Sequence, residues 1–84
     1  MNIGIIVQII GPVLDIEFAP GKLPGIYNAL KIKYREDGRE AVLTAEVAQH
    51  LGDNTVRAIT LGPTTGLGKG LPAEDTGSPL KVPV

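Results

Sequence analysis

The sequence contains no cysteine, no tryptophan and only three aromatic residues, two tyrosines and one phenylalanine. Without cysteine, the chain has neither a disulfide framework nor a thiolate metal site. The single histidine, His50, and the scattered carboxylates show no spacing typical of metal ligands. The scarcity of aromatic rings also removes the stacking platforms that single-stranded nucleic acids use.

The sequence also has no excess of positive or negative charge. Eight Lys and Arg residues oppose nine Asp and Glu residues, for a net charge of −1. A protein that binds the phosphate backbone would need clustered basic residues, so we expect no nucleic-acid partner. No apolar run approaches the roughly 20 residues that span a bilayer. The start, MNIGIIVQII, has neither the basic region nor the cleavage site of a signal peptide. We therefore expect a cytoplasmic, bacterial product without direct membrane insertion.

The stretch Glu40–Leu61 predicts a long antiparallel hairpin at the centre of the fold. Gly52-Asp53-Asn54 is a turn sequence, and the run after it is rich in β-branched residues. Before the turn, apolar or small residues alternate with polar ones, which indicates one face toward a core. The positions expected on that face are Ala41, Leu43, Ala45 and Val47.

A nearly continuous apolar run, Ile3–Ile10, begins the chain. Such a run is typical of a strand that is buried on both faces or that swaps faces partway. Gly11-Pro12 predicts a kink or bulge, so Ile3–Phe18 is expected to be two short strands or one sharply bent strand. In its second half, apolar residues alternate with Asp15 and Glu17, and we expect these two carboxylates on an exposed face.

The rest of the chain reads as short strands and loops. Tyr27–Tyr34 is a predicted strand with Lys31 and Lys33 on its wet face, and Arg35–Arg39 is a charged turn around Asp-Gly. The remaining segments are loops at Ala19–Gly25 and Gly62–Gly70, a short strand or turn at Leu71–Gly77, and a last edge strand at Leu80–Val84 that contains Pro83.

No segment shows the period of an amphipathic helix convincingly. Short strands separated by Gly and Pro turns predict an all-β fold, a small closed six-stranded β-barrel, Greek-key-like, with little or no helix. An open sheet of this size would leave long apolar edges exposed. The whole of residues 1–84 is expected to form this single barrel domain.

One stretch, Gly66–Gly70 (GLGKG), is reminiscent of a phosphate-binding loop. A Walker loop needs a glycine where this chain has Pro63, a hydroxyl residue where it has Gly70, and a helix that follows. We therefore interpret it as a barrel loop. His50 has only the solvated hairpin carboxylates nearby in sequence, so it lacks an evident nucleophile and orienting partner. No catalytic, cofactor-binding or metal-binding residue is predicted.

Four stretches together resemble the N-terminal β-barrel domain of the F-type ATP synthase beta subunit, in order and in spacing. They are Ile6–Phe18 (IVQIIGPVLDIEF), Pro20–Leu30 (PGKLPGIYNAL), Glu46–Ile59 (EVAQHLGDNTVRAI) and Asp75–Val84 (DTGSPLKVPV). The related alpha subunit shares the barrel but not the IYNAL and EVAQHLGDNTVR sequences.

The resemblance implies a non-catalytic assembly module. In this family, three alpha and three beta barrels form a crown that holds the catalytic head together, so alpha-subunit barrel domains are the expected partners. The parent complex makes ATP by using a proton gradient and lies peripherally on the cytoplasmic face of the membrane. ATP or ADP and magnesium belong to a following catalytic domain, so no cofactor is expected in these residues. In isolation we expect weak self-association.

The resemblance has one departure. The family usually has an acidic residue and an arginine where this chain has Thr65 and Lys69. Two other functions remain open from the residues alone, an OB-like barrel that binds single-stranded nucleic acid and a small enzyme. The first is opposed by the balanced charge and few aromatics, and the second by the lack of a nucleophile, base and orienting group.

Overall fold

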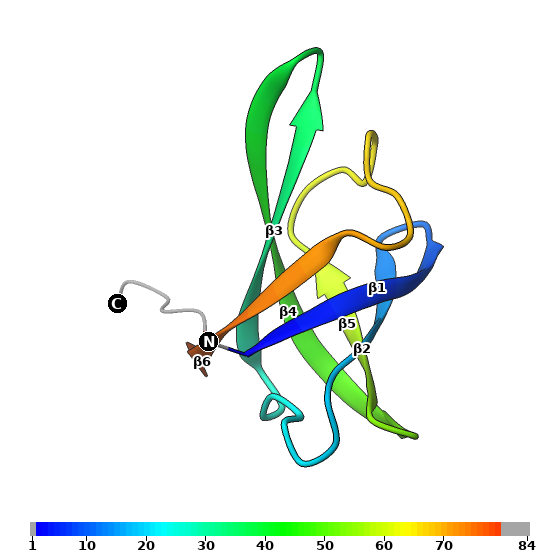
Figure 1. The fold of residues 1–84 in the computed structure, drawn as a ribbon, viewed down its shortest axis with the longest axis vertical. Helices are drawn as coiled ribbons and strands as arrows, with labels where there is room; N and C mark the ends of the chain where they lie inside the picture. The colour runs from blue at the N-terminus through cyan, green and yellow to red at the C-terminus, as the bar shows by residue number, and fades with distance from the viewer. Residues whose placement is uncertain (1, 80–84) are drawn as a thin grey trace.

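Six antiparallel strands close into a barrel in the computed structural model, which describes residues 2–79 (Figure 1). The strands are β1 (Ile3–Ile10), β2 (Val13–Glu17), β3 (Asn28–Glu36), β4 (Arg39–Gly52), β5 (Thr55–Thr60) and β6 (Pro72–Pro79). Their order around the barrel is β1-β2-β5-β4-β3-β6. The strands β3, β4 and β5 follow one another as neighbours, while β6 returns beside β3 and β2 lies beside β5, which is a Greek-key arrangement. The predicted fold class is confirmed, and residues 2–79 contain no helix.

The predicted kink or bulge at Gly11-Pro12 is wrong, because these two residues form a hairpin turn. Ile10 pairs with Val13, so only Gly11 and Pro12 connect β1 to β2. Gly11 has a φ of 57°. A two-residue turn with glycine first needs positive φ at that position, and the ring of Pro12 supplies the negative φ suited to the second. Residues 3–17 are therefore two short strands, which confirms one of the two predicted alternatives, and the alternative of one sharply bent strand is wrong.

Strand β1 changes faces partway, as one of the two sequence interpretations predicts. Its register with β2 shifts between Ile6 and Gln8, which marks a bulge. Before the bulge, Gly4 and Ile6 face the core, and after it Ile9 does. The other interpretation, burial on both faces, is wrong, because the alternate side chains of β1 are exposed.

Both predicted turns of the β3–β4–β5 meander are confirmed. Asp37-Gly38 and Asp53-Asn54 are each two-residue connections with positive φ at both positions, the geometry of the tight hairpin turns that match strand twist. The β3–β4 hairpin extends beyond the barrel as an arm (Figure 1). Residues 33–42 form this arm, because β6 pairs with β3 only as far as Ile32 and β5 pairs with β4 only from Ala45 onward.

Strand β6 closes the barrel between the first strand and the third. The sequence predicts a short strand or a turn for this segment, and the structure shows a strand. Its residue Glu74 pairs with Ile3 of β1 on one side and with Lys31 of β3 on the other. Asp75 strengthens the closure: its carboxylate accepts hydrogen bonds from the side-chain amides of Asn28, at 3.2 Å, and Asn2, at 3.4 Å. The predicted strand Leu80–Val84 lies outside the described residues.

The core fills the barrel interior with aliphatic side chains and one aromatic ring. Leu43 and Val47 belong to it, as predicted from their shared face on the central hairpin. The other members are Ile6, Leu14, Ile16, Phe18, Leu30, Ile32, Ala45, Val56, Ala58 and Ala73. Leu23, Tyr34, Leu67 and Leu71 pack against it from the loops and the arm.

Candidate assembly surface

An ion pair joins β2 to β5 on the outside of the barrel. Asp15 and Arg57 are register partners, and Arg57 Nε donates to Asp15 Oδ1 at 3.0 Å while its Nη2 donates to Oδ2 at 3.4 Å. The Asp15 side chain is 12% exposed and that of Arg57 40%. The hydrogen bond to Asp15, and then the negative charge of Asp15, raise the pKa of Arg57, so the guanidinium stays charged.

The ion pair corrects the prediction that Asp15 and Glu17 share an exposed face. Glu17 is exposed, whereas Asp15 is almost buried under the guanidinium. The two carboxylates therefore do not act as a pair. The sequence contains no signal for this contact, because residues 15 and 57 become neighbours only through the Greek-key placement of β2 beside β5.

His50 forms a hydrogen bond with a loop and contacts no catalytic partner in the described residues. Its Nε2 lies 2.7 Å from the carbonyl oxygen of Pro24, which is a buried residue of the loop between β2 and β3. Neither Asp53 nor Glu46 forms a hydrogen bond with the ring in the described part of the chain. The contact fastens the end of β4 to that loop.

The GLGKG stretch packs against the barrel. Gly70 N donates to Ile6 O at 2.7 Å, and Leu67 N donates to Thr64 O at 3.0 Å. Leu67 also lies against the core, as does Leu71 just after the stretch. Two of the amides that a phosphate cradle would need are therefore directed at carbonyl groups of the protein, and the loop serves as a cover over one end of the barrel.

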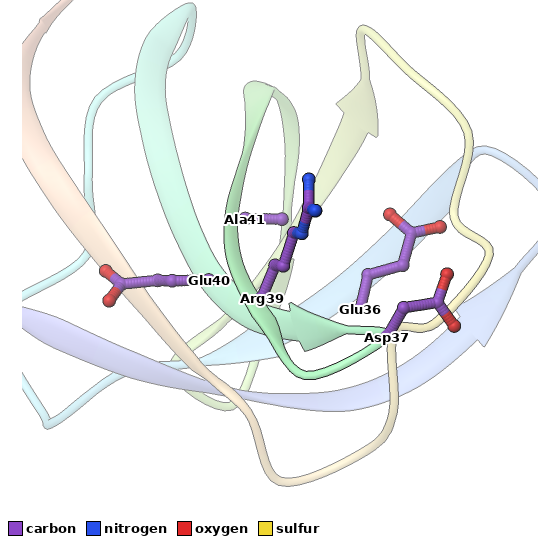
Figure 2. A pocket seen from close by; sticks show the side chains of 5 residues that line it. All are labelled: Glu36, Asp37, Arg39, Glu40 and Ala41. Carbon is purple, nitrogen blue, oxygen red and sulfur yellow. The ribbon is translucent and has the colours of Figure 1, made fainter.

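An open hollow of about 540 Å³ lies at the tip of the arm, lined by Glu36, Asp37, Arg39, Glu40 and Ala41 (Figure 2). Glu36 and Asp37 extend to one side of the hairpin and Glu40 to the other, so their carboxylates do not converge (Figure 2). Among residues 2–79, no group of three His, Cys, Asp or Glu side chains is placed to hold a metal ion. The hollow is therefore an open surface depression at the hairpin tip, lined mainly by charged side chains.

Lys31 and Lys33 lie on the outer face of β3, as predicted, beside a smaller hollow of about 190 Å³. Ile3, Pro72 and Glu74 complete its lining. No aromatic ring takes part, so this basic face offers no platform on which a base could stack. Residues 2–79 contain no helix, and so none that is long and apolar enough to cross a membrane.

Exposed aliphatic side chains are the feature of the surface that sequence reasoning missed. Ile10 is 57% exposed and Ile59 45% exposed, and with the half-buried Val13 between them they form a continuous outer row, because Ile10 pairs with Val13 and Val13 with Ile59. The other large exposed aliphatic residues are Ile3, Ile5, Val7, Ile26, Val42, Leu51 and Leu61. This row is therefore the candidate assembly surface of the barrel.

The barrel fold agrees with the comparison with known proteins. Residues 6–77 match the model of the ATP synthase alpha/beta family, beta-barrel domain, and this range runs from the middle of β1 through most of β6. The match covers well over half of the chain. The chain therefore belongs to the ATP synthase alpha/beta family and comprises its beta-barrel domain.

Proposed function

We propose that this chain is a non-catalytic assembly module, the N-terminal barrel of a beta-type subunit in the alpha/beta ring of a rotary, proton-translocating F-type ATP synthase. One observation supports it above the others: a barrel of this family carries rows of exposed aliphatic residues on its outer surface. A structural module that holds neighbours together needs such surface, whereas a freely soluble barrel does not.

Two neighbouring segments support the beta type over the alpha type. The stretches IYNAL and EVAQHLGDNTVR, which set the beta subunit apart, lie side by side in the fold, because Tyr27 N donates to Val47 O at 2.7 Å. The His50–Pro24 hydrogen bond joins the same two regions. The two stretches by which the chain resembles the beta subunit therefore form one structural unit.

The expected partners are alpha-subunit barrel domains, placed on either side of this barrel in the ring. ATP or ADP and magnesium would bind in the catalytic domain of the parent chain and not in these residues. The parent complex would lie on the cytoplasmic face of a bacterial membrane. The amides of the GLGKG stretch that bind protein carbonyls support the absence of a nucleotide from the barrel itself.

The test is association with an alpha-subunit barrel domain, prepared separately and mixed with this chain. We expect a saturable complex in sedimentation and calorimetric titration. The variant Ile59→Asp should weaken it by about tenfold or more, because a carboxylate would have to be buried in the apolar contact. Thr65→Asp is the matched control, since it places the same charge on an exposed loop.

The proposal fails if two folded barrels show no association at several hundred micromolar. A stable closed hexamer of this chain alone would also contradict it, because the ring requires two alternating kinds of subunit. Salt-dependent binding of a single-stranded oligonucleotide would instead favour the nucleic-acid alternative.

A further inference from the structure

Two rows of outward-facing residues cross the strands, and one of them reaches from the barrel onto the base of the arm, where Lys33 and Val42 lie. Row A consists of Ile5, Pro72, Lys33 and Val42, and row B of Ile10, Val13, Ile59 and Glu46. In row A, Ile5 pairs with Pro72 and Lys33 with Val42, while the pairing of Ile32 with Ala73 brings Lys33 beside Pro72. In row B, the successive pairs are Ile10 with Val13, Val13 with Ile59, and Ile59 with Glu46.

Each row combines three apolar residues with one charge, and the two charges have opposite signs. Neither charge has an ionic partner, because Arg57–Asp15 is the one ion pair found in residues 2–79. Lys33 stands between Pro72 and Val42, and Glu46 stands beside Ile59. Burying such a charge among apolar residues is unfavourable unless a group of opposite charge arrives with the covering surface.

The two rows run around opposite halves of the barrel. Row A crosses β1, β6, β3 and β4, whereas row B crosses β1, β2, β5 and β4, and the strand order of the closed barrel puts these paths on its two sides. The rows of one molecule therefore cannot cover each other. A contact between them must join two molecules.

We propose that row A of one copy of this chain packs against row B of a second copy, with Lys33 beside Glu46 and the aliphatic residues of the two rows in contact. Because two different surfaces meet, the contact is heterologous, and each added copy leaves one free row at either end. A patch of four residues is much smaller than a standard interface of about 800 Å² per partner, so association is weak and needs high protein concentration.

Sedimentation equilibrium of the full 84-residue chain, up to about millimolar concentration, tests the proposal. We expect the average mass to rise steadily with concentration. Lys33→Glu makes both rows acidic, and Glu46→Lys makes both rows basic. The association constant of each variant alone should therefore fall by about tenfold or more. In an equimolar mixture every contact can again join opposite charges, and association should return to near the wild-type level.

Charge-matched controls are exposed residues that belong to neither row. Lys69→Glu in the loop and Glu36→Lys on the arm change the net charge equally and should leave association unchanged. Thermal melts check that all variants fold. Should a charge variant be unstable, the pair Ile5→Asp and Ile59→Asp replaces it: each should be monomeric alone, and the mixture should form only a one-to-one complex.

Three results would overturn the inference: a wild-type chain that stays monomeric throughout, single variants that associate like the wild type, or a mixture of Lys33→Glu and Glu46→Lys that does not recover. A symmetric dimer that survives Ile59→Asp would show row A binding row A instead. The experiment contains only this chain, so its failure leaves the proposed alpha-subunit partner standing.

Discussion

Among the glycines, Gly4 has the least space for a side chain. It faces the core from β1, and a Cβ built on it would lie 2.8 Å from both Ile16 Cγ2 and Phe18 Cζ and 2.9 Å from the carbonyl oxygen of Glu17. The first two atoms are side-chain ends, but the third is backbone and cannot easily move. Glycine is needed here for space rather than for an unusual backbone conformation.

Gly4→Ala should therefore destabilise the barrel by roughly 1–3 kcal/mol, the usual effect of overpacking a core. Urea unfolding measures the change. Gly68→Ala is the control, because nothing lies within 4 Å of a Cβ at that position, and the substitution should be neutral or slightly stabilising. Equal stabilities for the two variants would show that the β1–β2 contact is looser than described.

Leu43 and Val42 allow a matched comparison on one strand. Leu43 is 8% exposed and faces the core, whereas Val42 is 54% exposed and faces outward. Leu43→Ala should cost about 2–5 kcal/mol, a large part of the roughly 4–13 kcal/mol expected for a domain of this size. Val42→Ala should change the melting temperature little. A melt of Leu43→Ala within a degree or two of wild type would contradict the face assignment.

At the scale of strands, the Asp15–Arg57 pair makes an asymmetric prediction. Arg57→Gln leaves a nearly buried carboxylate without its positive partner, while Asp15→Asn leaves a half-exposed guanidinium that can reach water. The amide oxygen that Asp15→Asn introduces can also still accept a hydrogen bond from the guanidinium. We expect Arg57→Gln to lower the urea midpoint more than Asp15→Asn does. The reverse order would mean that the pair does not bury Asp15 in solution.

The strands that sequence predicts best are those with strong alternation and a marked turn. The hairpins around Asp37-Gly38 and Asp53-Asn54 have both, because each turn demands residues that accept positive φ. Strand β6 has neither: PAEDTGSP is poor in β-branched residues, and its strand conformation comes from pairing with β1 and β3 at once. Tertiary contacts override local preference there.

The errors have similar physical causes. Gly11-Pro12 is compatible with a kink and with a turn, and only the pairing of Ile10 with Val13 decides between them. The bulge between Ile6 and Gln8 has no local marker. For the surface, the strand faces of Lys31 and Lys33 follow from alternation, but the row from Ile10 to Ile59 depends on which strands become neighbours. Strand order is a long-range property that local patterns do not contain.

At the scale of the whole molecule, we predict that the chain neither binds nor hydrolyses ATP. A single Lys–phosphate contact in water contributes about 1 kcal/mol, against roughly 8 kcal/mol for micromolar affinity. The amides of Leu67 and Gly70 already donate to protein carbonyls. Calorimetric titration with magnesium–ATP should show no saturable binding tighter than about 100 micromolar. Such binding, abolished by Lys69→Ala, would reverse this prediction and the assembly role with it.

The pairing of the first strand with the sixth also determines when the barrel can exist during synthesis. Of the six strands described in residues 2–79, β1 leaves the ribosome before the others, but one of its two neighbours, β6, emerges after all of them. Until then the backbone groups along one edge of β1 and one edge of β3 have no partner, and such edges are templates for other chains. The nascent barrel is therefore most prone to aggregate just before β6 appears, and residues 72–79 end that exposure in a single step.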